Sequence, residues 1–238
     1  MALLRRKRIY DRLRVMEEAE RARSRKKRRK AISLYRWVLA VEPNNAELHA
    51  KLAPLLAETG QSFDAWRSYR KTAGAALRER RDDRALAIYR DAANHLPHEM
   101  QAWQRLAHLL AKQGETEEAI GVLIEGSRQF RTPFLRSEAV HLLRRARAID
   151  PWHYDVVLEL AQHLGHSGQR EEARLLFKGL TQRTGGHRLR RVRAAQLRLD
   201  KSPAAAWHWI RSIARPQQEP VAKKPLRGVV PLRAQARR

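Results

Sequence analysis

The chain repeats itself at a spacing of 54 residues. When the sequence is shifted by that distance, residues of the same kind coincide and no insertion is needed. The matching sets are Ala31, Ala85 and Ala139; Pro43, Pro97 and Pro151; Leu52, Leu106 and Leu160; Gly60, Gly114 and Gly168; and Ala65, Ala119 and Ala173. A fixed period of this size is typical of repeat architectures, in which each unit packs against its neighbours. The sequence therefore predicts a stacked array of similar units.

Each unit has the pattern of α-helices. Its leucines recur at helical spacing, as Leu106, Leu109 and Leu110 do. The glycines at the 54-residue spacing suit the left-handed residue that ends a helix, and Ser62 and Thr116 follow two of them as candidate N-caps. We expect an all-α fold of about twelve helices with no strand. They should lie near residues 3–28, 31–42, 45–59, 63–79, 83–95, 98–113, 117–131, 134–149, 152–167, 170–183, 187–199 and 203–214.

The pattern inside each unit resembles the tetratricopeptide repeat, a helix pair of about 34 residues with small or apolar residues at fixed places. In the frame that begins at Met100, the matching residues are Trp103, Leu106, Ala107, Leu110, Gly114 in the turn and Ala119 at the helix crossing. The frames from Ala46 and Tyr154 match in the same way. The resemblance covers about residues 12–187. It implies a right-handed superhelical solenoid of antiparallel helices.

The period of 54 residues departs from that family, because it exceeds one helix pair by a single further helix. Two overlapping frames account for it. The helix near 63–79 closes the repeat that begins at Ala46 and opens the repeat that ends at Pro97, and the helix near 117–131 does the same one unit later. We therefore expect a three-helix unit.

Charge divides the chain into segments. The net charge is +25, but residues 31–182 hold 21 Lys and Arg against 19 Asp and Glu. Residues 1–30 hold 14 against 4, and residues 183–238 hold 15 against 2. We expect a basic N-terminal helix and polybasic turn (1–30), a solenoid (31–187), basic capping helices (188–215) and a disordered, basic, proline-containing tail (216–238).

The resemblance to the tetratricopeptide family implies a concave groove that binds a peptide or helix of another protein. Carrying the family's groove positions over to this sequence predicts a polar to basic groove. Its residues are Arg67, Arg70, Arg78, Gln101, Gln104, His108, Lys112, Arg128, Arg131, Gln162 and His166. A solvated face without a ligand is the alternative interpretation.

The basic ends predict a second kind of partner. Clustered Lys and Arg attract phosphate without regard to sequence, and an acidic protein or an anionic membrane would be attracted too. The candidate polyanion patch comprises Lys26, Lys27, Arg28, Arg29, Lys30, Arg188, Arg190, Arg191 and Arg193. Because Arg far outnumbers Lys and Ala is common, compositional bias is the alternative explanation.

The remaining residue types point away from catalysis. The chain has no cysteine, which favours a reducing compartment, and no apolar run approaches a membrane span. His163 and His166 stand three residues apart on one helix, but no third metal ligand joins them at a defensible spacing. The six tryptophans fit core packing better than base stacking. No phosphate loop, catalytic serine motif or paired acid is present. We therefore expect a cytoplasmic protein with no cofactor, no metal and no enzymatic activity.

Two functions follow from these patterns. The first is a non-enzymatic scaffold or adaptor that binds a partner segment in its groove. The alternative is a polyanion-binding protein for RNA, DNA or a ribosome surface, acting through the basic ends. The oligomeric state stays open.

Overall fold

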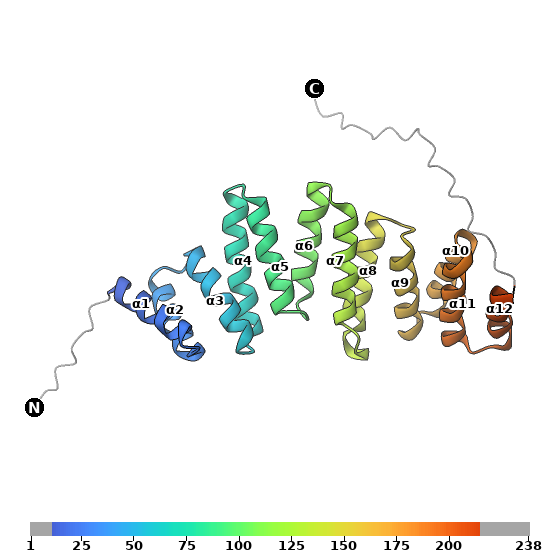
Figure 1. Cartoon of the computed structure of the whole chain (residues 1–238), viewed down its shortest axis with the longest axis horizontal. Helices are drawn as coiled ribbons and strands as arrows, with labels where there is room; N and C mark the ends of the chain where they lie inside the picture. The colour runs from blue at the N-terminus through green and yellow to red at the C-terminus, as the bar shows by residue number, and fades with distance from the viewer. Residues whose placement is uncertain (1–10, 215–238) are drawn as a thin grey trace, which may run out of the picture. The chain divides into compact units, whose positions relative to one another are not determined.

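The computed structural model describes residues 11–214 and contains twelve α-helices and one short 3-10 helix in that range, with no strand there (Figure 1). The predicted all-α fold is confirmed. The elements are α1 (Arg12–Ser24), α2 (Arg28–Val41), α3 (Ala46–Glu58), α4 (Ser62–Arg78), α5 (Asp82–His95), α6 (Met100–Gln113), α7 (Thr116–Gln129), η1 (Pro133–Leu135), α8 (Arg136–Ile149), α9 (Tyr154–His166), α10 (Arg170–Arg183), α11 (Gly186–Asp200) and α12 (Pro203–Ala214).

The three-helix unit is visible in the helix boundaries. Helices α2, α5 and α8 begin at residues 28, 82 and 136, and α4, α7 and α10 begin at residues 62, 116 and 170. Each step is 54 residues, as the sequence predicted. On a larger scale the chain divides into two compact units, residues 1–163 and residues 164–238. We call them the first unit and the second unit, as distinct from the three-helix units. The expected tail, residues 216–238, lies outside the described residues, as do residues 1–10.

The same backbone device ends four of the helices α1 to α8, namely α1, α3, α4 and α6. Gly60 and Gly114 have φ of 78° and 92°, as expected for left-handed caps, and Gly168 in the second unit has 83°. Lys26 and Arg80 occupy this conformation without being glycine, each with φ of 56°. After Gly60, the amide of Gln61 donates to the carbonyl of Leu56 at 2.9 Å. Such closures satisfy carbonyls that the helix end would leave unpaired.

Two local predictions were wrong. Ser62 and Thr116 are the first residues of α4 and α7, while Gln61 and Glu115 hold the N-cap positions without a side-chain bond. The closure after each glycine fixes where the next helix begins, so the preference of serine and threonine for caps is overridden. The basic run is also more than a turn. Because α2 begins at Arg28, residues 28–30 form its first helical turn.

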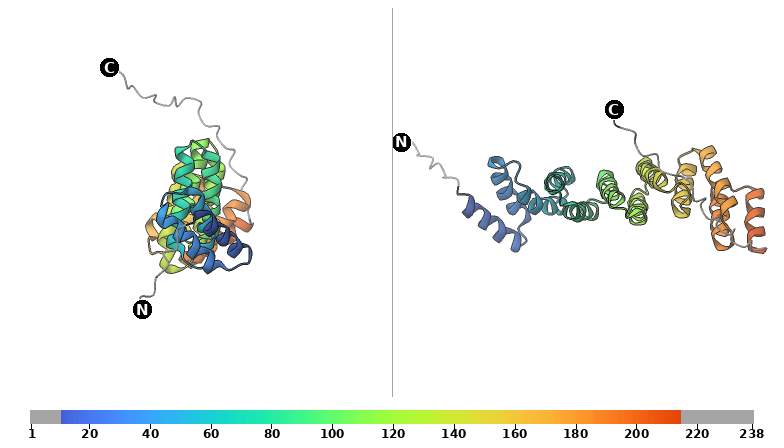
Figure 2. Two further views of the ribbon diagram at one scale, coloured as in Figure 1. Left: turned by 90° about the vertical axis from the view of Figure 1, so that its left-hand side faces the viewer. Right: turned by 90° about the horizontal axis from the view of Figure 1, so that it is seen from above.

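In the first unit, successive helices from α1 to α8 pack against one another, and α3 also contacts α5 as α6 contacts α8. Seen from above, helices α4 to α8 alternate between two rows (Figure 2, right). Small residues permit the close crossings, since Ala31, Ala65, Ala85, Ala119 and Ala139 are all fully buried. Two helices that are separated by one helix in the chain, such as α3 and α5, therefore lie on either side of the helix between them.

In the second unit, α11 packs against both α10 and α12. A close approach joins Gly165 to Leu199 of α11, because a Cβ at Gly165 would lie 2.6 Å from the Leu199 Cδ1 atom. No helix within residues 11–214 is long and apolar enough to cross a membrane.

Candidate protein-interaction grooves

Helices α2 and α4 flank a groove whose floor is α3. We call it the first groove, and its volume is about 570 Å³. Leu52 and Leu56 form a buried apolar floor, Leu39 and Ala40 add apolar surface from α2, and charged and polar side chains stand along the sides. The lining residues are Arg36, Leu39, Ala40, Pro43, His49, Leu52, Leu56, Asp64, Arg67, Ser68 and Lys71.

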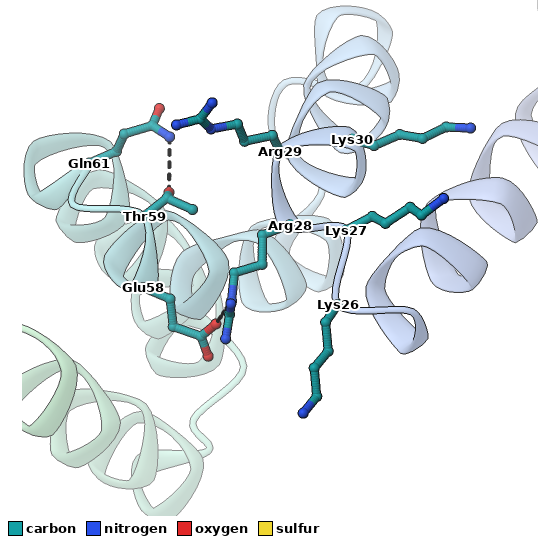
Figure 3. A pocket seen from close by; sticks show the side chains of 8 residues that line it. All are labelled: Lys26, Lys27, Arg28, Arg29, Lys30, Glu58, Thr59 and Gln61. Atoms are coloured by element: carbon teal, nitrogen blue, oxygen red, sulfur yellow. Dashed lines mark hydrogen bonds and ion pairs between the residues drawn. The ribbon is translucent and has the colours of Figure 1, made fainter.

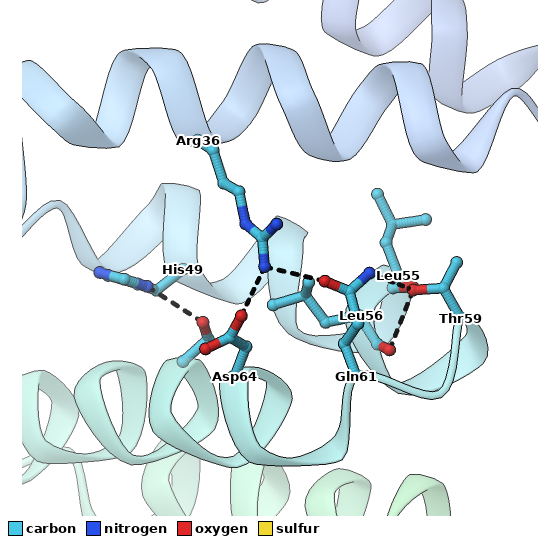
Figure 4. Close-up of polar contacts among 8 residues, drawn as sticks. Arg36, His49, Leu55, Leu56, Thr59, Gln61 and Asp64 are labelled. Carbon is cyan, nitrogen blue, oxygen red and sulfur yellow. Dashed lines mark hydrogen bonds and ion pairs between the residues drawn. The ribbon is translucent and has the colours of Figure 1, made fainter.

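A polar network closes one end of the first groove (Figure 4). The Arg36 guanidinium reaches from α2 to the start of α4, where its Nη2 atom lies 2.5 Å from Asp64 Oδ2 and 2.8 Å from Gln61 Oε1. Gln61 Nε2 donates to Thr59 Oγ1 at 3.0 Å, and the Thr59 hydroxyl donates to the Leu55 carbonyl at 2.9 Å. Arg36 is therefore held across the groove and is already paired.

His49 joins the floor to both sides of the first groove. Its side chain is buried, with Nε2 3.0 Å from the Pro43 carbonyl and Nδ1 3.2 Å from Ser68 Oγ. A carbonyl can only accept, so Nε2 carries the proton and the Ser68 hydroxyl donates to Nδ1. Burial lowers the pKa of the His49 imidazole. The ring is thus a neutral structural link.

A second groove lies between α5 and α7 with α6 as its floor, and its volume is about 310 Å³. Each of its lining residues stands 54 positions after a residue of the first groove. They are Arg90, Ala93, Asn94, Trp103, Leu106, Glu118, Gly121, Val122 and Glu125. The cross-groove ion pair recurs, because Arg90 Nη2 lies 2.5 Å from Glu118 Oε1 as Arg36 does from Asp64. The two grooves are copies of one site.

Trp103 occupies the place of His49 and makes the same bond. Its Nε1 donates to the Pro97 carbonyl at 2.9 Å, just as His49 bonds Pro43 six residues before it. The larger indole is accommodated by Gly126, since a Cβ there would lie 2.7 Å from Trp103 Cγ. The second groove is the smaller of the two.

The two copies differ in charge. In the first groove, Arg67 and Lys71 add positive charge beyond the Arg36–Asp64 pair, and Lys71 Nζ donates to the Pro43 carbonyl at 2.6 Å. In the second groove, the equivalent residues are Gly121 and Glu125. The first groove is therefore basic, and the second is acidic.

The groove residues predicted from the sequence lie mostly outside these hollows. Only Arg67 lines the first groove, and none lines the second. Lys112 Nζ pairs with Asp82 Oδ2 at 2.9 Å, and Arg128 Nη2 pairs with Glu159 Oε1 at 2.5 Å. The other members are exposed except for two glutamines, which are half-buried; the set comprises Arg70, Arg78, Gln101, Gln104, His108, Arg131, Gln162 and His166.

Sequence reasoning missed Arg36, His49, Asp64, Lys71 and their counterparts one unit later. A signal was present, because the 54-residue offset relates Arg36 to Arg90 and Asp64 to Glu118. The repeat is most evident in alanine, leucine, glycine and proline, whereas Asp64 and Glu118 match only in charge.

The polybasic segment Lys26–Lys30 lines a separate hollow of about 680 Å³, together with Glu58, Thr59 and Gln61 (Figure 3). Arg28 forms an ion pair with Glu58, and Lys30 Nζ lies 2.6 Å from Glu18 Oε1. Lys26, Lys27 and Arg29 form no ion pair within the described residues. Figure 3 shows these three side chains pointing in different directions, which suits an extended ligand better than a single ion.

The C-terminal half of the candidate polyanion patch lies on α11, in the second unit. Arg188, Arg190 and Arg191 are exposed. Arg193 is half-buried, its Nη1 donates to Gln196 Oε1 at 3.1 Å, and burial lowers its pKa. Three of the four arginines therefore lie exposed on the surface of α11.

Core packing was the expected role of the tryptophans, and this prediction is confirmed in part. Trp66 and Trp103 are 5% and 3% exposed, but Trp37, Trp152 and Trp207 are 40%, 41% and 63% exposed. The latter three lie outside the helix-crossing positions that decide burial. Within residues 11–214, no group of three or more His, Asp or Glu side chains is placed to hold a metal ion.

Antiparallel helices stacked in series, with equivalent grooves in two successive three-helix units, define an α-helical repeat protein. The sequence model of the tetratricopeptide repeat matches residues 76–133 and 136–199, just over half of the chain. The chain belongs to the tetratricopeptide repeat family, whose stacked repeats form extended protein-binding surfaces and are typical of non-catalytic scaffolds.

The solved structures to which the chain is similar are distant in sequence. A putative kinesin light chain of Podosopora anserina with TPR-like repeats is 19% identical, with 80% of this chain and 96% of that chain covered and a TM-score of 0.37. The MamA protein is 18% identical, with 71% and 90% covered and a TM-score of 0.30. YrrB, a TPR protein with an unusual peptide-binding site, is 13% identical, with 84% and 92% covered and a TM-score of 0.28. A search of curated proteins finds no match.

Proposed function

We propose that the chain is a non-enzymatic adaptor that binds an acidic segment of a partner protein, with apolar side chains between its acids, in the first groove. The observation that carries this proposal is the combination of an apolar floor with unbalanced positive charge. Leu39 and Ala40 offer apolar surface on the α2 side, over the buried Leu52 and Leu56, and Arg67 and Lys71 stand on the α4 side. An extended segment could place apolar side chains against Leu39 and Ala40 and carboxylates beside the two cations.

The size of the first groove supports a peptide ligand. Its 570 Å³ falls within the usual range of ligand sites, about 300–1,000 Å³. Its charges lie at the sides, where they remain hydrated, so that they favour approach and selectivity more than affinity. The apolar surface of Leu39 and Ala40 then contributes to the binding free energy.

A charge-reversal pair tests this proposal. The probe is a fluorescent peptide of alternating Glu and Leu, titrated by anisotropy at about 0.15 M salt. Arg67→Glu should weaken binding about tenfold, because it places a carboxylate beside the ligand's own. Arg70→Glu is the matched control, since Arg70 lies on the same helix, is exposed and does not line the groove; it should change the dissociation constant less than twofold. Equal losses in both variants would show non-specific attraction and contradict groove binding.

We propose as a second candidate that the Lys26–Lys30 segment binds the phosphates of a nucleic acid. The supporting observation is electrostatic. The N-terminal turn of a helix favours acidic side chains, and the equivalent turns of α5 and α8 carry Asp82, Asp83 and Glu138. The first turn of α2 carries Arg28, Arg29 and Lys30 and no acid. Cations there oppose the helix dipole, and a bound polyanion would relieve that cost.

The repeat supplies a matched control for this candidate. Lys26 and Lys27 correspond to Arg80 and Arg81 one unit later, in turns with the same φ of 56° at Lys26 and Arg80. The double variant Lys26→Gln/Lys27→Gln should weaken binding of a mixed-sequence single-stranded RNA and reduce the slope of log K against log salt by about 0.7 per lost contact. Arg80→Gln/Arg81→Gln removes the same charge and should leave the slope unchanged. If both double variants have the same effect on RNA binding, then net charge and not the Lys26–Lys30 segment accounts for the binding.

A further inference from the structure

The three-helix unit has a geometric consequence for the two grooves. Successive helices alternate between two rows, so helices an even number of steps apart share a row and helices an odd number apart do not. Equivalent helices of neighbouring units are three steps apart. The first groove opens between α2 and α4, the second opens between α5 and α7, and Figure 2 shows α5 and α7 in the row opposite to that of α4. Equivalent sites therefore face opposite sides of the helix stack.

We propose that the second groove is a separate binding site, on the opposite side of the stack from the first, and that it takes a cationic segment of a partner protein. This inference rests on the proposed function, because it assumes that the repeated groove is a peptide site. It adds a second ligand of opposite charge. The chain would then bridge two partner segments from its two sides.

The choice of a cationic ligand follows from the charges of the second groove. Glu118 is engaged by Arg90 at 2.5 Å, whereas Glu125 makes no ion pair in the described part of the chain. Gly121 replaces the arginine of the first groove, and Arg90, the cation that lines the second groove, is already paired with Glu118. A volume of about 310 Å³, with the exposed Glu125 at its side and the buried Leu106 and Val122 beneath, suits one long cationic side chain.

A concave surface that continues from unit to unit is the arrangement expected of a regular helix-pair array. The alternation changes this expectation for the present chain. Of the groove residues predicted from the sequence, Gln101 and Lys112 lie on α6 in the row of α4, but Arg128 lies on α7 in the other row. A single extended ligand threading all of them is therefore not what the three-helix unit provides.

The absence of cysteine from the chain makes the experiment direct. Ala40 and Asn94 are equivalent, exposed and line the first and second grooves respectively. Ala40→Cys and Asn94→Cys would each carry one environment-sensitive fluorophore. The probes are a peptide of alternating Glu and Leu and its Lys–Leu counterpart, each tested alone and then fused to a bulky carrier protein. We expect the acidic probe to change only the label at 40, and the basic probe only the label at 94.

A charge variant and the carriers complete the test. Glu125→Lys should weaken the basic probe at least tenfold and leave the acidic probe within twofold. Carrier-borne probes should bind together without competing, since the grooves face opposite sides. If the acidic probe does not change the fluorescence of the label at residue 40, the proposed function itself is overturned. If that label responds and the label at 94 does not, or if Glu125→Lys has no effect, or if the carriers compete, this inference alone is overturned.

Discussion

Two residues of the first unit hold a left-handed backbone without being glycine. Lys26 and Arg80 each have φ of 56° and occupy the turns that Gly60 and Gly114 occupy elsewhere. For a residue with a Cβ, this conformation costs about 1–2 kcal/mol relative to the right-handed helix region, and glycine adopts it freely. Two helix ends are therefore strained.

Replacing Arg80 with glycine should remove that strain. We expect Arg80→Gly to raise the free energy of unfolding by about 0.5–1 kcal/mol, a gain reduced by the greater freedom of glycine in the unfolded chain. Urea denaturation followed by circular dichroism measures it. The neighbouring Arg81 has φ of −96°, so Arg81→Gly should give no increase. A fall in stability for Arg80→Gly would mean that its side chain contributes more than the strain costs.

At two equivalent pairs of positions, one beside each groove, a larger side chain at one position is offset by a smaller side chain at the other. His49 and Thr72 correspond to Trp103 and Gly126 one unit later, where the larger ring is matched by the loss of a side chain. Gly126→Thr should collide with Trp103, whose Cγ would lie 2.7 Å from the new Cβ, and lower the free energy of unfolding by about 1–3 kcal/mol.

The companion substitution identifies the cause of that loss. Adding Trp103→His to Gly126→Thr recreates the combination of His49 and Thr72 and should recover part of the stability. Gly121→Ala is the control, since nothing lies within 4 Å of a Cβ there; it should stabilise α7 by up to about 1 kcal/mol, as alanine is the better helix former. A double variant no more stable than Gly126→Thr alone would contradict the view that Gly126 makes room for the Trp103 ring.

At the scale of helices, His49 ties α3 to Pro43 after α2 and to Ser68 on α4. Burial lowers its pKa in the folded protein, while an unfolded histidine titrates near pH 6.5. Protons therefore bind the unfolded chain more readily. The contribution of His49 to stability is intact above about pH 6.5 and declines as pH falls below it.

The pH dependence can be assigned by comparing variants. Free energies of unfolding measured between about pH 8 and pH 5 should fall more steeply for the native chain than for His49→Gln, which has no imidazole to protonate. His108 is exposed on α6, so His108→Gln should retain the native slope. If His49→Gln keeps the full slope as well, the proton is taken up elsewhere.

The helices themselves could be predicted from the sequence to within three residues at most ends, because leucine spacing, left-handed glycines and crossing alanines are local signals. The ion pairs between helices could not be predicted from the sequence. Arg28 pairs with Glu58, and one unit later Asp82 pairs with Lys112 with the charges exchanged. The pair recurs while neither residue does, so a search for matching residues passes over it. The grooves were missed for the related reason that they depend on how the three-helix unit folds in space.

At the scale of the whole molecule, net charge and ion pairing oppose each other. The chain carries +25, and this self-repulsion destabilises the folded state. Its inter-helix ion pairs are largely exposed, as at Arg36 and Asp64, whose side chains are 47% and 43% accessible. Each such pair contributes about 0–1 kcal/mol. Repulsion should therefore dominate at low ionic strength.

Added salt should consequently stabilise the protein. Raising NaCl from about 0.01 M to 0.15 M shortens the Debye length from about 30 Å to about 8 Å, which screens repulsion between distant charges more than attraction within close pairs. We expect the melting temperature, followed by circular dichroism, to rise by a few degrees over this range. Lys26→Gln/Lys27→Gln/Arg29→Gln removes three cations that form no ion pair in the described part of the chain, so this variant should melt higher at low salt and respond less to NaCl. A melting temperature that falls as NaCl is added would show that the ion pairs outweigh the net charge, and that the basic segments are spaced widely enough not to repel.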